Sequence, residues 1–461
     1  MNIFIHRRDI RCQDNTTLLA MKNVLPLFIY TPEQIDPQKN PYFSDNLVEY
    51  LSESLLELQK NYQSLGGDLL ICYGDIIATL EKIHKISQIK TLGFNVDYSP
   101  YSKKRDQAIE DWAKKHQIKI INKEDHLLVN ILEGATKSPN SDQPYKVYTP
   151  FYNNVKNIKV MQPVLDKPSL LKSSSIPDKI KSLCIKEDKV RSFFKANPHA
   201  NVKGGRSNAL LKLKLLKDQT HYASKRDQLT YQTSHLSGAL NLGVLSIREV
   251  YHHAVSVLGK TNTYIKELYW RDFYYNVLYY FPHVVGGPFK PEFSKIKWRN
   301  DKKEFTKWCE GQTGYPVVDA AMRQLNTTGF MHNRARMIVA SFLTKHLLID
   351  WRWGEKYFAT KLIDYNISAN NGGWQWSFGS GTDAQPYFRI FNPWSQGEKY
   401  DSDCEYVKKW IPELNSVPNK DIHAWYIKYI DHPTIKYPQP IVDHAKAREL
   451  FMEHAKVLKR S

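Results

Sequence analysis

The residue types best suited to chemistry gather in residues 369–376, where two asparagines and two glycines precede two tryptophans. Asn and Gly in succession favour a turn, and glycine lets the backbone approach a ligand closely. We therefore expect a turn at residues 370–373 that interrupts any helix there. Trp374 and Trp376 are one residue apart, so their rings should point in different directions and contact different partners. On its own, the segment fits a ligand site and a glycine turn capped by core tryptophans equally well.

Polar groups suited to a diphosphate lie upstream of this segment. Tyr222 and residues 233–237 offer closely spaced hydroxyl groups and backbone N–H donors. Arg271 adds a fixed positive charge, and a guanidinium can hydrogen-bond a phosphate through two nitrogens. These residues indicate a site for a phosphate-containing ligand.

A second polar set includes Asn333 and Arg336, which are three residues apart and so lie on one face of a helix. Asp364 could pair with Arg336, a pairing typical of a buried polar site. Each of these residues, taken singly, is explained by an ordinary structural salt bridge. Their occurrence together favours a binding site.

The framework that must position these residues has two different halves. Over residues 1–130, short β-branched runs alternate with helical patterns such as residues 44–62 and 102–116. This alternation predicts an α/β fold with a doubly wound parallel sheet. The predicted strands are residues 2–5, 24–30, 68–72, 91–96 and 118–121. No G-x-G-x-x-G follows the first strand, so a nicotinamide-binding fingerprint is absent.

Residues 131–189 contain Ser-, Pro- and Lys-rich stretches that indicate a long surface linker between domains. Residues 190–461 show helical periodicity and almost no strand alternation. The aromatic-rich stretch 264–281 is an example, with Glu267 and Arg271 on one face. We therefore predict an N-terminal α/β domain, a linker and a large all-α domain.

The composition narrows the class of partner. The chain has 461 residues, a formal net charge of +18 and a pI near 9.3. Such a charge favours a polyanionic partner, because Lys and Arg that neutralise phosphates release counterions, although a generally basic protein fits as well. Five scattered cysteines without C-x-x-C spacing argue against a zinc site and a disulfide framework. With no run of about 18 apolar residues, we expect a soluble, cytoplasmic protein with access to DNA.

Longer motifs, in one order along nearly the whole chain, resemble those of the photolyase/cryptochrome family. They begin with residues 7–11, followed by Asp14 and Asn15, and end with residues 386–393. Between them lie residues 148–151, at the expected turn out of the N-terminal domain, and three further motifs at 233–237, 267–274 and 314–323. Within the family, the chain looks most like the bacterial-type, class I cyclobutane pyrimidine dimer photolyases.

This resemblance implies that FAD binds in the helical domain. The residues implied to contact it are Tyr222, Thr233, Ser234, His235, Leu236, Ser237, Arg271, Asn333, Arg336, Asp364, Tyr365, Asn366 and Asn370. Asn370 matches the position facing flavin N5, where repair enzymes of the family carry Asn and plant cryptochromes usually carry Asp. Asn366 stands where the family usually has Asp near flavin N3, so its hydrogen bond would be uncharged. His235 replaces a common Arg and removes a fixed charge.

The implied activity is light-driven repair of cyclobutane pyrimidine dimers in DNA, a lyase reaction. Photoexcited reduced FAD would pass an electron to a dimer flipped out of the duplex, with Glu267 and Asn370 acting at the reaction centre. The residues implied to contact DNA are Arg226, Glu267, Trp270, Asn333, Arg334, Met337, Trp376 and Arg389. Trp374, Trp351 and Trp298 match the family's electron relay. Their spacing alone would suit core tryptophans, so the relay rests on the resemblance.

A second, antenna chromophore is left open. Ser102 and Lys103 stand where folate-binding members of the family have Asn and Glu, so a pterin, a deazaflavin or no antenna all fit. The alternative functions are a (6-4) photolyase, whose subfamily has a His within residues 333–337, a signalling cryptochrome, and a flavin-less nucleic-acid-binding module. We expect a monomer that acts on damaged DNA, with no metal and no membrane partner.

Overall fold

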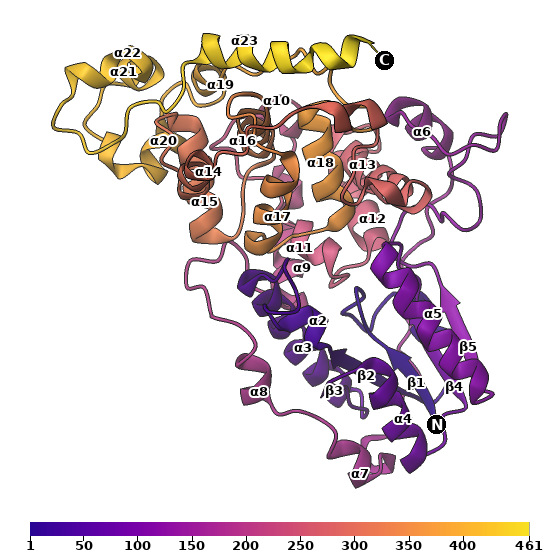
Figure 1. Ribbon diagram of the computed structural model, residues 1–461. Coiled ribbons are helices and arrows are strands. Elements are labelled where there is room, and N and C mark those ends of the chain that lie inside the picture. Colours follow the sequence, from indigo (N-terminus) through magenta and orange to yellow (C-terminus); the bar gives the residue numbers. More distant parts are fainter. Residues whose placement is uncertain (461) are drawn as a thin grey trace.

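Five strands form one parallel sheet in the N-terminal part of the chain, in the order β3-β2-β1-β4-β5 (Figure 1). This computed structural model describes residues 1–460. The strands are β1 (Asn2–Ile5), β2 (Val24–Tyr30), β3 (Leu70–Tyr73), β4 (Thr91–Asn95) and β5 (Lys119–Lys123). They are the five predicted strands, with some ends shifted by a residue or two.

The winding of the sheet reverses at β1, which pairs in parallel with β2 on one side and with β4 on the other. All of β2 is buried, as expected of a central strand with helices on both faces of the sheet. Ser44, Asp75 and Ser99 each begin a helix by accepting a hydrogen bond from the N–H group three residues on. The predicted doubly wound α/β fold is confirmed. Its helices are α1 (Thr16–Leu19), α2 (Pro32–Ile35), α3 (Asp45–Ser64), α4 (Ile76–Ile86) and α5 (Pro100–Lys115).

The segment that connects the two parts carries short helices of its own. They are α6 (Tyr148–Val155), α7 (Asp178–Lys181) and α8 (Glu187–Arg191). Residues 148–151 begin α6, so the turn expected there is wrong. The helix forms because Phe151 and Val155 are buried in the core and Tyr148 stacks on Trp270, with ring centroids 3.8 Å apart. The chain through α7 and α8 then passes round the outside of the sheet (Figure 1).

The rest of the described chain is helical, as predicted. Its α-helices are α9 (Arg206–Lys214), α10 (Tyr222–Lys225), α11 (Ser237–Asn241), α12 (Ile247–Leu258), α13 (Thr263–Tyr280), α14 (Lys302–Glu310), α15 (Pro316–Thr328), α16 (Asn333–Lys345), α17 (Trp351–Lys361), α18 (Ile367–Phe378), α19 (Pro393–Tyr400), α20 (Glu405–Trp410), α21 (Asn419–His423), α22 (Trp425–Lys428) and α23 (His444–His454). No helix within residues 1–460 has both the length and the apolar character needed to cross a membrane.

Helix α18 runs through the segment predicted as a glycine turn, so the turn expected at residues 370–373 is wrong. The side-chain oxygen of Asn366 caps this helix by accepting hydrogen bonds from N–H groups of its first turn. Gly372 is required by packing, because a Cβ there would lie 2.1 Å from Cδ1 of Tyr274. Tertiary packing therefore outweighs the low helix propensity of the paired Asn and Gly residues.

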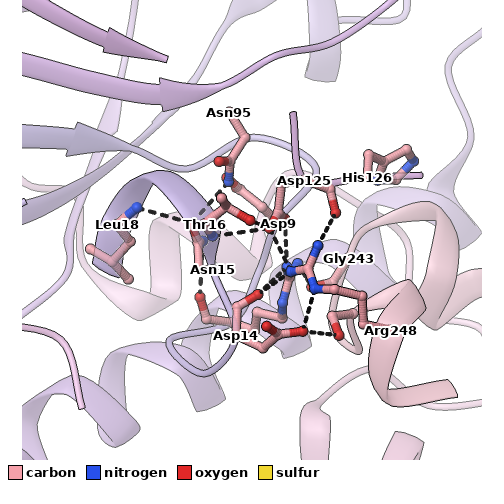
Figure 2. Close-up of polar contacts among 12 residues, drawn as sticks. Asp9, Asp14, Asn15, Thr16, Leu18, Asn95, Asp125, His126, Gly243 and Arg248 are labelled. Atoms are coloured by element: carbon pink, nitrogen blue, oxygen red, sulfur yellow. Dashed lines mark hydrogen bonds and ion pairs between the residues drawn. The ribbon is translucent and has the colours of Figure 1, made fainter. Parts of the chain in front are cut away.

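A buried ionic cluster joins the N-terminal part to the helical part (Figure 2). Arg248 of α12 lies 2.9 Å from Asp14 and 2.8 Å from Asp125. Arg11 pairs with Asp125 and also donates to the carbonyl of Gly243 at 3.1 Å. Burial alone would raise the pKa of Asp125, but Arg11 and Arg248 hold it below its usual range. Removing one member would leave an uncompensated buried charge, so the cluster fixes how the two parts meet.

Gly243 lets the backbones of the two parts approach each other. Its φ of +61° lies in the left-handed region, and a Cβ there would be 2.2 Å from the carbonyl oxygen of Arg8. Beside it, the N–H of Ile10 donates to the carbonyl of Leu242 at 3.0 Å. A side chain at position 243 would push these two segments apart.

Candidate functional site

Two adjoining cavities lie between helices α13, α16 and α18. Their volumes are about 320 and 330 Å³, the range of small-molecule sites. The residues that border both cavities are Glu267, Trp270, Tyr274, Asn333, Arg336, Asp364, Asn366 and Ala369. Because the border is shared, the cavities are two ends of one site.

Nearly all the residues expected to bind FAD line this site. Those that line it are Tyr222, Thr233, Ser234, His235, Leu236, Ser237, Arg271, Asn333, Arg336, Asp364, Asn366 and Asn370. Tyr365 instead stacks its ring on Tyr42 of the N-terminal part, with centroids 6.4 Å apart. Its carbonyl accepts a hydrogen bond from Asn241, which does line the site.

One end of the site presents hydroxyl groups and an uncharged histidine. The hydroxyls of Ser234 and Tyr264 lie 3.0 Å apart. His235 adopts a φ of 52°, and its Nδ1 accepts from the side chain of Asn201 at 2.8 Å. Burial lowers the pKa of His235 to about 4, so this ring is neutral near pH 7. The fixed positive charges that line this end are therefore those of Arg271 and Arg336.

The ion pair predicted between Arg336 and Asp364 is confirmed. Nη2 of Arg336 lies 3.1 and 2.9 Å from the two carboxylate oxygens of Asp364. Nε of Arg336 donates to the carbonyl of Met331 at 2.8 Å. These three contacts fix the plane of the guanidinium group at the border of the two cavities.

Asn366 is oriented by its neighbours. Its Nδ2 donates to Oδ1 of Asn241 at 3.0 Å and to the hydroxyl of Tyr275, while its Oδ1 caps α18. Arg8 also donates to the Tyr275 hydroxyl, at 3.3 Å. Both Arg8 and Asn366 can only donate to this hydroxyl. Nε2 of His126 lies 2.8 Å from the hydroxyl and 2.5 Å from Nη2 of Arg271, which also can only donate, so this nitrogen is an acceptor that the hydroxyl and Arg271 share. The hydroxyl of Tyr275 thus links Asn366 to Arg8 and His126 of the N-terminal part.

Glu355 of α17 supports the asparagines of α18. The side chain of Asn370 donates to the backbone carbonyl of Glu355 at 3.0 Å, and that of Asn371 donates to its carboxylate at 2.9 Å. Burial raises the pKa of Glu355 to about 7, although the bond from Asn371 opposes the shift. Near neutral pH this carboxyl group is therefore divided between its protonated and ionised forms.

Glu267 and Arg226, expected to contact DNA, form an ion pair with each other at the opening of the site. Their side chains are 35% and 34% exposed. Burial raises the pKa of Glu267, and Arg226 partly offsets that rise. The arrangement places a hydrogen-bonding carboxyl group directly beside a cation that can contact phosphate.

Aromatic and apolar side chains form the walls at this end. Trp270, Trp376 and Met337, all expected to contact the flipped dimer, line the site together with Tyr274. The ring of Trp270 lies nearly parallel to that of Tyr148, with an interplanar angle of 7°, and this stacking holds its plane. Stacking surfaces beside polar groups are what an extrahelical base requires.

The other two arginines expected to contact DNA lie outside the lining of the two cavities. Arg334 pairs with Asp227 at 2.7 Å, and its guanidinium carbon lies 4.6 Å from the ring centroid of Tyr400. Arg389 is exposed, and its backbone carbonyl accepts from Nζ of the buried Lys345 at 2.8 Å. Contact of either side chain with a phosphate backbone therefore stays a prediction.

The three relay tryptophans pack in one hydrophobic cluster. Trp374 and Trp351 are both buried, whereas Trp298 is partly exposed. Trp374 makes ring contacts with Phe358, at 5.0 Å between centroids, and with Trp308, at 6.1 Å. The partial exposure of Trp298 suits the outer end of a relay, and the relay itself stays a prediction.

The positions that bear on an antenna make contacts within the protein. The hydroxyl of Ser102 donates to the carboxylate of Asp97 at 2.8 Å. Nζ of Lys103 donates to the carbonyl of Tyr279 at 3.3 Å and lies 3.7 Å from the centroid of its ring. Lys103 therefore joins the N-terminal part to α13, whereas the hydrogen bond of Ser102 stays within the N-terminal part.

Sequence reasoning missed Tyr274, Tyr275, Asn241 and Glu355. Tyr274 could have been found, because it follows Glu267 and Arg271 by seven and three residues and so lies on the same face of α13. The other three act through partners far away in the chain. No local pattern marks such residues.

The site fits the dinucleotide that the sequence resemblance implies. One end offers hydroxyl groups and a guanidinium for phosphates, and the other offers amides and an ion pair for a polar ring edge. Trp374 Nε1 is buried and has no hydrogen-bond partner within the described residues, as expected of a donor left beside a cavity. A nucleotide cofactor with a polar heterocycle would therefore find partners along the whole site.

Comparisons with known proteins agree with this site. Residues 2–169 match the family model described as DNA photolyase, and residues 264–457 match that described as FAD binding domain of DNA photolyase. A deoxyribodipyrimidine photo-lyase of Halobacterium salinarum is 35% identical over 97% of this chain and 97% of its own length. The enzyme of the same name from Escherichia coli is 36% identical over 96% of this chain and 95% of its own length.

Solved structures give the same result. A class III photolyase from Agrobacterium tumefaciens superposes with a TM-score of 0.90 at 34% identity, covering 100% of this chain and 98% of that one. An archaeal photolyase from Sulfolobus tokodaii with two FAD molecules gives a TM-score of 0.85 at 35% identity. The match covers 99% of this chain and 100% of that one. A cryptochrome from Synechocystis gives 0.88 at 26% identity, over 98% of each chain.

Proposed function

Since this chain belongs to the photolyase/cryptochrome family, we propose that it repairs cyclobutane pyrimidine dimers in DNA in a light-driven reaction that uses FAD. The observation that carries the proposal is the shared border of the two cavities. It joins an end lined by hydroxyl groups and Arg271 to an aromatic end lined by the partly exposed Arg226 and Glu267, which supports the proposal. A bound cofactor and an extrahelical base would therefore be near neighbours.

The chain's own residues bind and orient the two reactants. Trp270 and Trp376 would stack against the flipped dimer, while Glu267 and Asn333 would hydrogen-bond its base edges. The carboxylate of Glu267, which is ion-paired with Arg226, would accept hydrogen bonds from the base edge. When bound, reduced FAD supplies the light-driven electron that opens the cyclobutane ring. Asn370 and the Arg336–Asp364 pair would hold the polar edge of its ring.

The basic charge of the chain supports binding to a phosphate backbone. Arg334 and Arg389 lie outside the base-binding cavity, so they would position the strand without reading its sequence. The net charge of +18 would draw the protein to DNA at low salt. We also propose that the protein acts as a cytoplasmic monomer, since one chain contains the whole site.

The test has two steps on the purified full-length protein. An absorption spectrum should contain flavin bands, and comparing the amounts of chromophore and protein also shows whether a second chromophore is bound. The protein, reduced and exposed to blue light, should then restore an oligonucleotide that contains one thymine dimer. The same sample kept in the dark should leave the oligonucleotide unchanged.

Each other outcome points to a different function. Flavin bands without repair of either photoproduct would favour a signalling cryptochrome. The similar protein from Synechocystis is named a cryptochrome. Repair of a (6-4) photoproduct alone would favour that subfamily, although residues 333–337 contain no His. DNA binding without flavin bands would overturn the proposal in favour of a binding module.

A further inference from the structure

Two cysteines outside the site face each other at the edge of the sheet. Cys72 belongs to β3, an edge strand, and Cys184 follows α7 in the connecting segment. The two residues form an isolated antiparallel bridge. Beside them, the N–H of Ile185 donates to the carbonyl of Ile71 at 2.8 Å. The connecting segment passes round this edge in Figure 1, and at this one point it pairs with β3.

The pairing brings the two sulfur atoms to the same side of the backbone. The hydrogen bond joins the residues that flank the two cysteines, so Cys72 and Cys184 are a non-hydrogen-bonded pair. In such pairs the Cα atoms are about 4.5 Å apart and the side chains lie on one face. Disulfides span Cα separations of about 4.4–6.8 Å. The backbone therefore needs little or no movement for a disulfide to form.

The environments of the two thiols differ in the way that exchange chemistry requires. Cys72 is buried, whereas Cys184 is partly exposed. A hydrogen bond from the Cys72 thiol lowers the pKa of Cys184, and the same contact raises the pKa of Cys72. Burial instead raises the pKa of Cys309 to about 12. Cys184 is therefore the accessible nucleophile, and Cys72 is the buried thiol that then attacks the mixed disulfide on Cys184.

We propose that Cys72 and Cys184 form a redox-active pair, which a low-molecular-weight disulfide such as oxidised glutathione converts into a disulfide bond. The Cys184 thiolate attacks one glutathione sulfur, forms a mixed disulfide and releases one glutathione thiolate. That thiolate takes up the proton of Cys72, whose sulfur then attacks the sulfur of Cys184 and displaces the second glutathione. Two protein thiols are oxidised by two electrons, and one oxidised glutathione becomes two glutathione molecules.

The bond would fasten the connecting segment to the edge of the sheet. β3 is paired on its other side with β2, so the segment around Cys184 covers backbone groups that would otherwise be an open sheet edge. The two cavities are lined only by residues of the helical part. Oxidation should therefore stabilise the segment without changing flavin binding, and the outcome does not depend on the proposed repair activity.

The experiment uses the flavin-loaded full-length protein, incubated in the dark with oxidised glutathione, alkylated and analysed by mass spectrometry. We expect a loss of two free thiols, a peptide pair that joins Cys72 to Cys184, and full reversal by a dithiol reductant. Limited proteolysis within residues 172–184 should slow at least threefold on oxidation. Glutathione adducts on separate cysteines, or links that involve another cysteine as often, would overturn the proposal.

Two variants assign the order of attack, and a third is the control. Cys72→Ser should stop at the mixed disulfide on Cys184, whereas Cys184→Ser should leave Cys72 unmodified. Cys309→Ser, a half-buried cysteine of the helical part, should still form the cross-link in full. If Cys72→Ser fails to fold, the peptide map of the unaltered protein still decides the question. Adduct formation at Cys72 in the Cys184→Ser variant would contradict the assigned order.

Discussion

The side-chain amide of Asn366 donates a hydrogen bond to the hydroxyl of Tyr275, and this bond connects the flavin-binding site to the N-terminal part of the molecule. Arg8 reaches the same hydroxyl at 3.3 Å and lies 3.8 Å from the carboxylate of Asp97. The orientation of a residue in the cofactor site therefore depends on charges near the start of the chain. The α/β part therefore contributes hydrogen bonds that orient a residue of the site.

Replacing Tyr275 with Phe tests this connection. The change leaves one N–H of the Asn366 amide without its acceptor, whereas Nε2 of His126 keeps the hydrogen bond from Arg271, and a buried unsatisfied group costs about 1–3 kcal/mol. We expect a fall of that size in the free energy of urea-induced unfolding and faster loss of flavin. The control is Tyr73→Phe, since Tyr73 is 44% exposed. Equal stability of the two variants would show that the hydroxyl has no structural role.

Asn366→Asp tests a position at which the family resemblance would lead us to expect Asp. The cap of α18 is kept, because either side chain accepts from the backbone. A new negative charge should disfavour the reduced, anionic cofactor by about 1–3 kcal/mol, or roughly 20–70 mV for a two-electron couple. The midpoint potential, measured by spectroelectrochemistry, should fall by that amount. Asn153→Asp, on the exposed surface of α6, should leave it unchanged.

Glu355→Gln should change how stability depends on pH. Glu355 is 8% exposed and burial raises its pKa to about 7 in the folded protein, from 4.5. The folded state thus holds this proton more tightly than the unfolded state, so its stabilising contribution is full below pH 4.5 and lost as the pH rises through 7. Gln should therefore be more stable than Glu at pH 8, by roughly 2–3 kcal/mol.

The matching measurement is the unfolding free energy in urea at pH 5 and pH 8. Gln keeps the oxygen that accepts the hydrogen bond from Asn371, so the two proteins differ mainly in whether the side chain can ionise. The advantage of the variant should shrink as the pH falls toward 5. Parallel profiles for the two proteins would mean that Glu355 ionises normally.

The two adjacent glycines of α18 offer a matched pair of substitutions. A Cβ at Gly372 would lie 2.1 Å from the ring of Tyr274, whereas a Cβ at Gly373 would meet no atom within 4 Å. Gly372→Ala should destabilise the protein by about 1–3 kcal/mol through overpacking. Gly373→Ala should stabilise the flavin-free protein by up to about 1 kcal/mol, because alanine favours helix. The measurement is the thermal unfolding midpoint of both variants. A midpoint for Gly372→Ala above that of Gly373→Ala would contradict the prediction.

Trp374→Phe should separate photoreduction from repair. The phenyl ring keeps the wall of the site but is much harder to oxidise than indole, so photoreduction of the oxidised flavin should slow at least tenfold. Repair by the chemically reduced variant should stay within about threefold of the unaltered protein. The comparison is with Trp308→Phe, which removes the neighbouring ring at 6.1 Å. Loss of repair in the chemically reduced Trp374 variant would count against a relay role.

The strands could be predicted because their signal is local. A run such as Val24–Tyr30 is apolar on both faces, so its burial and parallel pairing follow from its composition. The ion pair of Arg336 with Asp364 could also be predicted, from residue types that complement each other. The resemblance to the family then assigned most lining residues, because it carries information on contacts that no single window of sequence holds.

The failures have one physical cause. The Asn and Gly residues before Trp374 favour a turn locally, but Tyr274 occupies the space beside Gly372 and Asn366 caps the helix, so the segment is helical. Glu355 and Tyr275 contribute through partners in other helices or in the other part of the chain. Propensity describes one segment at a time, whereas these residues are selected by what packs against them.

The ionic cluster of Figure 2 has a consequence for the order in which the protein is made. A ribosome releases Asp14 and Asp125 well before Arg248, so for that interval Asp125 has only Arg11 as an ion-pair partner, and the carboxylate of Asp14 lacks the partner that Arg248 provides. The first part of the chain to be synthesised therefore waits for α12 before its fold is complete. Stalled nascent chains that end before residue 248 should be cut by protease within the α/β part, and longer ones should resist.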